Sequence, residues 1–71
     1  MSRNIRVLLG KRIKEVRAQK GFTQEELSVK SKIDYKYIQK IEGKTPPNVT
    51  IETICKMARA LGVSISELVN F

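Results

Sequence analysis

The sequence predicts an all-α fold of five helices, and three observations support this prediction. Apolar residues recur at helical spacing, and no stretch shows a sustained alternation of apolar and polar residues. Four segments carry the same helix-start pattern, in which a capping residue stands just after one apolar residue and four positions before another. The length of 71 residues fits a single small domain, which we expect to span residues 1–71.

The first helix is expected over residues 4–20. Its predicted buried face consists of apolar residues at helical spacing, namely Ile5, Leu8, Leu9, Ile13 and Val16. Gly21 follows the segment and is typical of a residue that ends a helix in the left-handed conformation. The rest of the segment is basic, which we interpret mainly as a solubilising face with a minor role in phosphate contact.

The other four helices are placed by their predicted N-caps, which are Thr23, Asp34, Thr50 and Ser64. Each cap has an apolar residue before it and another four residues after it, as in a hydrophobic staple. Glu26 and Glu67 stand three residues after Thr23 and Ser64, so both of these starts also predict a capping box. The helices are therefore expected over residues 24–31, 35–42, 51–61 and 65–70.

The helix over residues 51–61 has a clear apolar stripe. The stripe predicts a buried face formed by Ile51, Ile54, Cys55, Ala58 and Leu61. Cys55 is the single cysteine of the chain, so no intramolecular disulfide is possible. We interpret it as a small core residue rather than a redox switch.

The charge balance favours a polyanionic partner. The chain has 14 Lys and Arg against 7 Asp and Glu, which gives a net charge of +7. Nucleic acid is the first candidate for such a partner, and an anionic membrane is the second. The sequence has no apolar run of the roughly 20 residues that span a bilayer and no signal peptide. We therefore expect a cytoplasmic protein with no membrane partner.

The composition also argues against catalysis. Histidine is absent and only one cysteine is present. A zinc site and the Ser-His or Cys-His nucleophile pairs therefore lack their residues. The carboxylates are few and scattered, which gives little support for a magnesium-dependent nuclease or a glycosidase. We expect no enzymatic activity, no metal and no cofactor.

The second and third helices are separated only by residues 32–34, which is the form of a helix-turn-helix motif, here over about residues 23–42. In this motif the N-terminal residues of the second helix face base edges in the major groove. Lysines recur every four residues, at Lys32, Lys36, Lys40 and Lys44. Like charges at this spacing repel one another, so the stripe predicts DNA contact, although a solvated lysine face is the alternative.

Nearly the whole chain, residues 8–69, resembles the lambda-repressor-like DNA-binding domains, also called the Xre or Cro/C1 type. The most specific segments are TQEEL at residues 23–27, YIQKIE at residues 37–42 and ARALGVS at residues 58–64. The resemblance implies a compact five-helix fold with the helix-turn-helix at its second and third helices. It also implies sequence-specific binding to double-stranded DNA.

The resemblance implies roles for individual residues. Gln24 matches a family glutamine that meets a DNA phosphate, and Tyr35 and Lys36 lie where the family reads bases. The predicted DNA-binding residues are Thr23, Gln24, Asp34, Tyr35, Lys36, Tyr37, Gln39, Lys40 and Lys44. Arg17 and Glu42 match a family pair that forms a structural salt bridge. For Tyr37 we expect a half-buried ring.

Two positions depart from the family pattern. Lys32 stands in the turn where the family usually has glycine, so a left-handed backbone there would cost about 1 kcal/mol. The alternative is a slightly altered turn. Glu42 and Gly43 are adjacent, whereas the family usually has one residue between them, and the following loop is about one residue longer.

These observations together predict a prokaryotic or phage transcriptional regulator, of the phage-repressor or restriction–modification controller type. It is expected to bind a palindromic operator as a homodimer. The resemblance places the dimer contact in the last helix, at Ile65, Leu68, Val69 and Phe71. The alternative is an antitoxin-like interaction module whose main partner is a small toxin protein.

Overall fold

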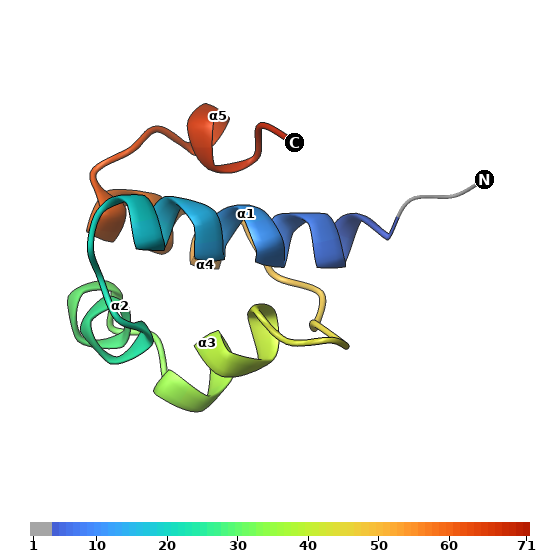
Figure 1. Cartoon of the computed structure of the whole chain (residues 1–71), viewed down its shortest axis with the longest axis horizontal. Helices are drawn as coiled ribbons and strands as arrows, with labels where there is room; N and C mark the ends of the chain where they lie inside the picture. The colour runs from blue at the N-terminus through green and yellow to red at the C-terminus, as the bar shows by residue number, and fades with distance from the viewer. Residues whose placement is uncertain (1–3) are drawn as a thin grey trace.

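A computed structural model describes residues 4–71, and this part of the chain folds into five helices (Figure 1). They are α1 (Ile5–Gln19), α2 (Gln24–Ser31), α3 (Tyr35–Ile41), α4 (Ile51–Leu61) and α5 (Ile65–Leu68). The predicted all-α fold is confirmed, and the predicted helix bounds agree to within two residues. Residues 1–3 of the predicted domain lie outside the described residues. Within residues 4–71, no helix is long and apolar enough to cross a membrane.

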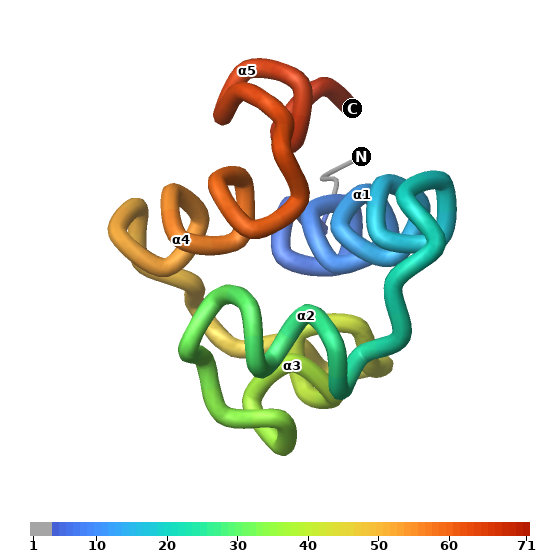
Figure 2. Tube along the Cα trace, turned by 90° about the vertical axis from the view of Figure 1, so that its left-hand side faces the viewer, coloured from blue at the N-terminus to red at the C-terminus, as the bar shows by residue number. Residues whose placement is uncertain are grey.

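The helices form layers. Figure 2 shows α1 and α4 at one level, α2 and α3 below them, and α5 above. α2 packs against α3 and α4, whereas α1 packs against α3 and α5. The third helix therefore lies at the edge of the molecule opposite α5 (Figures 1 and 2), where one of its faces is free for a partner.

Local side-chain hydrogen bonds start three of the four helices that the sequence analysis placed by their N-caps. The Thr23 hydroxyl accepts a hydrogen bond from the Glu26 N–H at 3.0 Å, and the Glu26 carboxylate accepts one from the Thr23 N–H at 2.9 Å. This is the predicted capping box. Thr50 and Ser64 also accept a backbone hydrogen bond at the start of α4 and α5.

Two capping predictions are wrong in detail. Asp34 precedes α3 but makes no side-chain capping hydrogen bond. The second capping box is incomplete, because the Ser64 hydroxyl donates to the Glu67 carboxylate at 3.5 Å where a bond from the Ser64 backbone N–H was expected. At α3 the buried staple residue Ile38 holds the helix start without a side-chain cap, whereas at α5 the buried Leu68 adds to the hydrogen bond that the Ser64 hydroxyl accepts from the Glu67 N–H.

The core gathers apolar side chains from all five helices and the turn between α2 and α3. Its fully buried large members are Ile13, Leu27, Ile38, Ile41, Met57 and Leu68. The predicted α4 stripe is partly wrong, because Ile51 is 64% exposed and Cys55 is only half-buried, whereas Met57 is fully buried. The observed buried arc runs through positions 54, 57, 58 and 61, and at 100° per residue Ile51 and Cys55 fall at its edge.

The predicted buried face of α1 is wrong at its first position. Ile5 is 67% exposed, while Leu9, Ile13 and Val16 are buried as expected. A close crossing between α1 and α3 follows at Gly10. A Cβ atom added at Gly10 would lie 2.1 Å from the backbone oxygen of Ile41. Glycine therefore allows α1 to rest directly on the end of α3, which fixes the position of α3 in the fold.

Candidate nucleic-acid interface

Of the two alternatives for the turn between α2 and α3, the structure shows the left-handed conformation at Lys32. Its backbone has φ 59° and ψ 31°, although lysine replaces the glycine that tolerates this conformation best. Two serines fix the turn, because Ser28 Oγ donates to the Ile33 carbonyl at 2.6 Å and Ser31 Oγ accepts from the Ile33 N–H at 3.3 Å. These bonds and the burial of Ile33 hold Lys32 in its strained backbone.

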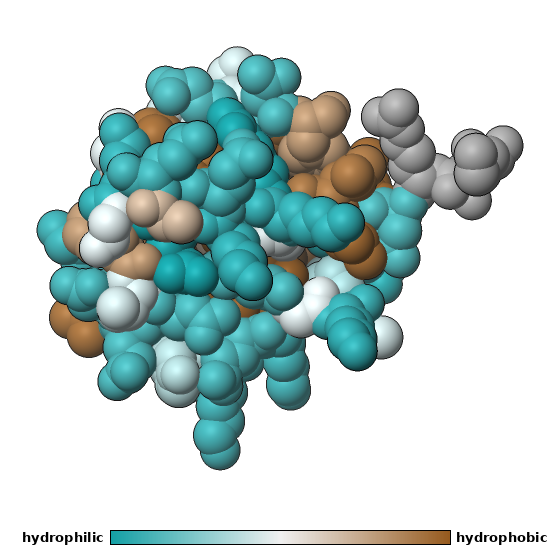
Figure 3. Space-filling view, in the orientation of Figure 1, coloured by the Kyte–Doolittle hydropathy of each residue, from teal (hydrophilic) through white to brown (hydrophobic). Residues whose placement is uncertain are grey.

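The third helix divides into a buried and an exposed side. Ile38 and Ile41 are buried in the core, and Tyr37 is half-buried against it. The exposed side carries Tyr35, Lys36, Gln39 and Lys40. Figure 3 shows long hydrophilic side chains projecting from the lower edge of the molecule, where α3 lies in Figure 1. The structure therefore brings the predicted base-reading residues together on one accessible face, with Asp34 and Lys44 exposed at its two ends.

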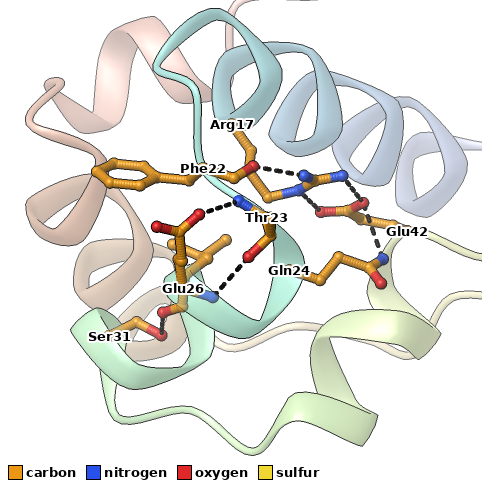
Figure 4. Close-up of polar contacts among 8 residues, drawn as sticks. Arg17, Phe22, Thr23, Gln24, Glu26, Ser31 and Glu42 are labelled. Carbon is orange, nitrogen blue, oxygen red and sulfur yellow. Dashed lines mark hydrogen bonds and ion pairs between the residues drawn. The ribbon is translucent and has the colours of Figure 1, made fainter.

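The start of α2 lies beside this face. Gln24 is half-buried, and its Nε2 donates to the Glu42 carboxylate at 3.1 Å (Figure 4). An amide nitrogen carries two N–H bonds, so one remains for a further acceptor. The Thr23 hydroxyl accepts within its capping box and still has its own proton to donate. Gln24, the predicted phosphate contact, and Thr23, a predicted DNA-binding residue, therefore each keep a hydrogen-bond donor for a further partner.

An ion pair at the centre of the fold joins these elements, and its partners are the predicted Arg17 and Glu42. Arg17 Nε and Nη2 donate to the two carboxylate oxygens of Glu42 at 2.8 and 2.9 Å. Arg17 Nη1 donates to the Phe22 carbonyl at 2.7 Å (Figure 4). The hydrogen bond to Glu42 raises the pKa of Arg17 against the opposing effect of its burial. The pair thus ties α1 to the end of α3 and, through Gln24, to the start of α2.

The predicted dimer residues do not all lie on the surface. Ile65, Val69 and Phe71 are exposed, but Leu68 is completely buried. Leu68 is therefore a core residue of one chain rather than a contact residue, because it forms the apolar staple of α5. Figure 3 shows hydrophobic surface between the C-terminal end of the chain and the N-terminal half of α1. Ile5, which the sequence pattern assigned to the core, is an exposed apolar residue of that helix.

Within the described part of the chain, no group of three or more carboxylate or thiol side chains is placed to hold a metal ion. The exposed face of α3 is instead built from amide, phenol and ammonium groups. These groups donate hydrogen bonds, which suits the acceptor-rich edge of a nucleic acid.

Comparison with known proteins agrees with this geometry. Residues 13–68 match the family model described as helix-turn-helix. The chain belongs to this helix-turn-helix family, of the Cro/C1 type. It is 36% identical to the control protein C.BamHI of Bacillus amyloliquefaciens, over 100% of this chain and 88% of that protein. It is 33% identical to the transcriptional regulator SinR of Bacillus licheniformis, over 89% of this chain and 57% of that protein.

A solved structure shares the fold as well. The crystal structure of the restriction–modification controller protein C.AhdI from Aeromonas hydrophila superimposes with a TM-score of 0.83 at 36% identity. The match covers 89% of this chain and 94% of that chain. The resemblance noted at residues 8–69 is therefore confirmed at the level of both family and fold.

Proposed function

We propose that the protein is a transcriptional regulator that binds double-stranded DNA and belongs to the restriction–modification controller type. The observation that carries this proposal is the exposed face of α3, a helix whose position in the fold is held by the Gly10–Ile41 crossing and the Arg17–Glu42 pair. The names of the relatives C.BamHI and C.AhdI support the controller type. They give no support to a small toxin protein as partner.

In this proposal α3 enters the major groove with its N-terminal end toward the bases. Tyr35 and Lys36 contact base edges there, and lysine favours the O6 and N7 acceptors of guanine. Gln39 lies one turn beyond Tyr35 and suits the N6 and N7 groups of adenine. Gln24 and Lys44 contact phosphates at the two ends of the motif.

Residues 1–71 act as one DNA-binding domain, and two copies bind a palindromic operator. The exposed apolar side chains of Ile65, Val69 and Phe71 support a homodimer, because exposed apolar groups commonly mark protein contacts. A two-fold dimer requires half-sites whose centres lie about 10 base pairs apart. The protein works in the cytoplasm on DNA and has no catalytic role, so plasmid DNA incubated with it and Mg²⁺ should remain intact.

The test is selection of bound duplexes from a random DNA library at about 150 mM salt. We expect an enriched palindrome for the natural chain and a changed half-site for Lys36→Ala. Lys56→Ala is the matched control, because it also removes one exposed positive charge from a helix but lies on α4. Binding without an enriched sequence, or the same palindrome for all three proteins, would contradict the assignment of α3 as the reading helix.

A further inference from the structure

A group of lysines outside the helix-turn-helix lies where α1 meets the end of α3. A hollow of about 400 Å³ is lined there by Val7, Lys11, Lys14, Glu42, Gly43 and Lys44. We call this site the lysine hollow. Its three lysines come from two segments far apart in the sequence, and the Gly10–Ile41 crossing holds these segments together.

The lysine hollow is cationic and its lysines lack ion-pair partners. Its one carboxylate, that of Glu42, is only 2% exposed and is bound by Arg17 and Gln24. Among residues 4–71, the ion pairs are those of Arg12 with Glu15 and of Arg17 with Glu42. Lys11, Lys14 and Lys44 are exposed and belong to neither pair. Three ammonium groups around one hollow therefore repel one another unless an anion lies between them.

The position of the lysine hollow indicates which anion it receives. Glu42 lines the hollow and also holds Gln24, so the hollow lies beside the side chain proposed to meet a DNA phosphate. Lys44 belongs both to the hollow and to the predicted DNA-binding residues that continue from α3. We propose that Lys11 and Lys14 of α1, together with Lys44, bind backbone phosphates of the DNA strand that borders α3. This inference rests on the proposed DNA-binding function and assigns α1 a direct part in it.

A second basic hollow provides a control. Lys30, Lys32, Lys56 and Arg59 line a hollow of about 300 Å³ between α2 and α4. α4 packs on α2 and α5, whereas α1 packs on α3 and α5. Lys56 and Arg59 therefore lie on a helix that packs on α2 rather than on α3, and like Lys11 and Lys14 they are exposed.

The experiment compares Lys11→Gln/Lys14→Gln with Lys56→Gln/Arg59→Gln in the full chain, because both variants lose two positive charges. DNA affinity is measured by fluorescence anisotropy from 50 to 300 mM salt. Each lost phosphate contact makes the fall of log affinity with log salt concentration less steep by about 0.9. At about 150 mM salt this corresponds to about a fivefold loss of affinity. For each bound chain we expect about a thirtyfold loss of affinity and a slope less steep by about 1.8 for the α1 variant, with less than about a threefold loss for the α4 variant. A bound homodimer loses twice as many contacts, so its slope should become less steep by about 3.6.

A second measurement locates the contact on the DNA. Single phosphates of the bound duplex are replaced by neutral methylphosphonates, and we expect one or two replacements to weaken the natural chain but not Lys11→Gln/Lys14→Gln. Two results would overturn the proposal while leaving DNA binding intact. One is an equal loss of affinity in the two double variants, and the other is a Lys11→Gln/Lys14→Gln variant that is as sensitive to every methylphosphonate as the natural chain. If the natural chain itself shows no binding to any duplex, the proposed function fails rather than this inference. Circular dichroism melting should show that both variants are folded.

Discussion

Replacing Glu42 by alanine should remove a large part of the stability of the fold. The Glu42 side chain is 2% exposed and accepts two hydrogen bonds from Arg17 and one from Gln24. Without it, the guanidinium of Arg17, whose side chain is 12% exposed, keeps only the Phe22 carbonyl as a partner. The variant therefore leaves a nearly buried charge without its counter-ion.

The expected cost follows from that burial. Breaking a buried ion pair by removing one partner costs about 3–5 kcal/mol. A chain of this length has a total free energy of unfolding of about 4–10 kcal/mol. The loss should lower the melting temperature by about 15–30 °C, because small domains lose several degrees per kcal/mol. Added salt should change the loss little, since a buried pair is weakly screened.

Urea unfolding of a double-mutant cycle gives the measurement. Glu42→Ala and Arg17→Ala are each compared with the variant that carries both changes. The double variant should be less destabilised than the sum of the single variants, with a coupling energy of about 2 kcal/mol. Strict additivity would refute the reasoning, because it would mean that the two side chains stabilise the fold independently of each other.

Three further substitutions test other parts of the structure. Lys32→Gly should raise the free energy of unfolding by about 0.5–1 kcal/mol in urea, because glycine relieves the left-handed strain but loses more backbone entropy. Gly10→Ala should destabilise by about 3 kcal/mol or more, since its Cβ meets the Ile41 backbone oxygen; an unchanged melting temperature would disprove the close crossing. Hydrogen bonds from Thr23 lower the pKa of Glu26. The stability that this carboxylate adds to the fold is therefore present above its unfolded pKa of about 4.3, and it is lost as the pH falls through the lowered pKa of the folded chain. When the pH is lowered from 5 to 3, the melting temperature of Glu26→Ala should therefore fall less than that of the natural chain.

The helix layout was predictable because its signals are local. A cap and its staple lie within five residues of each other, so Thr23 with Leu27 marks the start of α2 whatever the rest of the chain does. Residue type alone did not establish every hydrogen bond. Asp34 is a favourable cap residue, yet its side chain makes no capping bond in the turn that follows the left-handed Lys32.

The arrangement of helices was predictable only in part, because it depends on where neighbouring helices lie. Leu68 and Val69 are adjacent apolar residues in and after a four-residue helix, and only the packing of α5 shows that the first is buried and the second exposed. The lysine hollow has the same origin. No sequence spacing connects Lys11 with Lys44, and their proximity follows from the α1–α3 crossing.

The resemblance identified Arg17 and Glu42 as a structural pair, but the hydrogen bond to Gln24 gives Glu42 a second role that can be separated from stability. A Glu42→Leu/Arg17→Met variant replaces the buried pair by apolar side chains and keeps the net charge. Such replacements are often neutral or stabilising, so this variant should remain folded. Gln24 would lose the acceptor that orients its amide, and DNA binding should then weaken by about 0.5–1.5 kcal/mol, the cost of immobilising one flexible side chain.

Adding Gln24→Ala to that variant distinguishes the two roles. If Glu42 acts on DNA binding by orienting Gln24, the third change should cost less affinity than Gln24→Ala does alone, because part of the contact has already been lost. If the apolar variant binds DNA as tightly as the natural chain, Glu42 only supports the fold. The recognition surface would then depend on the rigidity of α3 and not on this hydrogen bond.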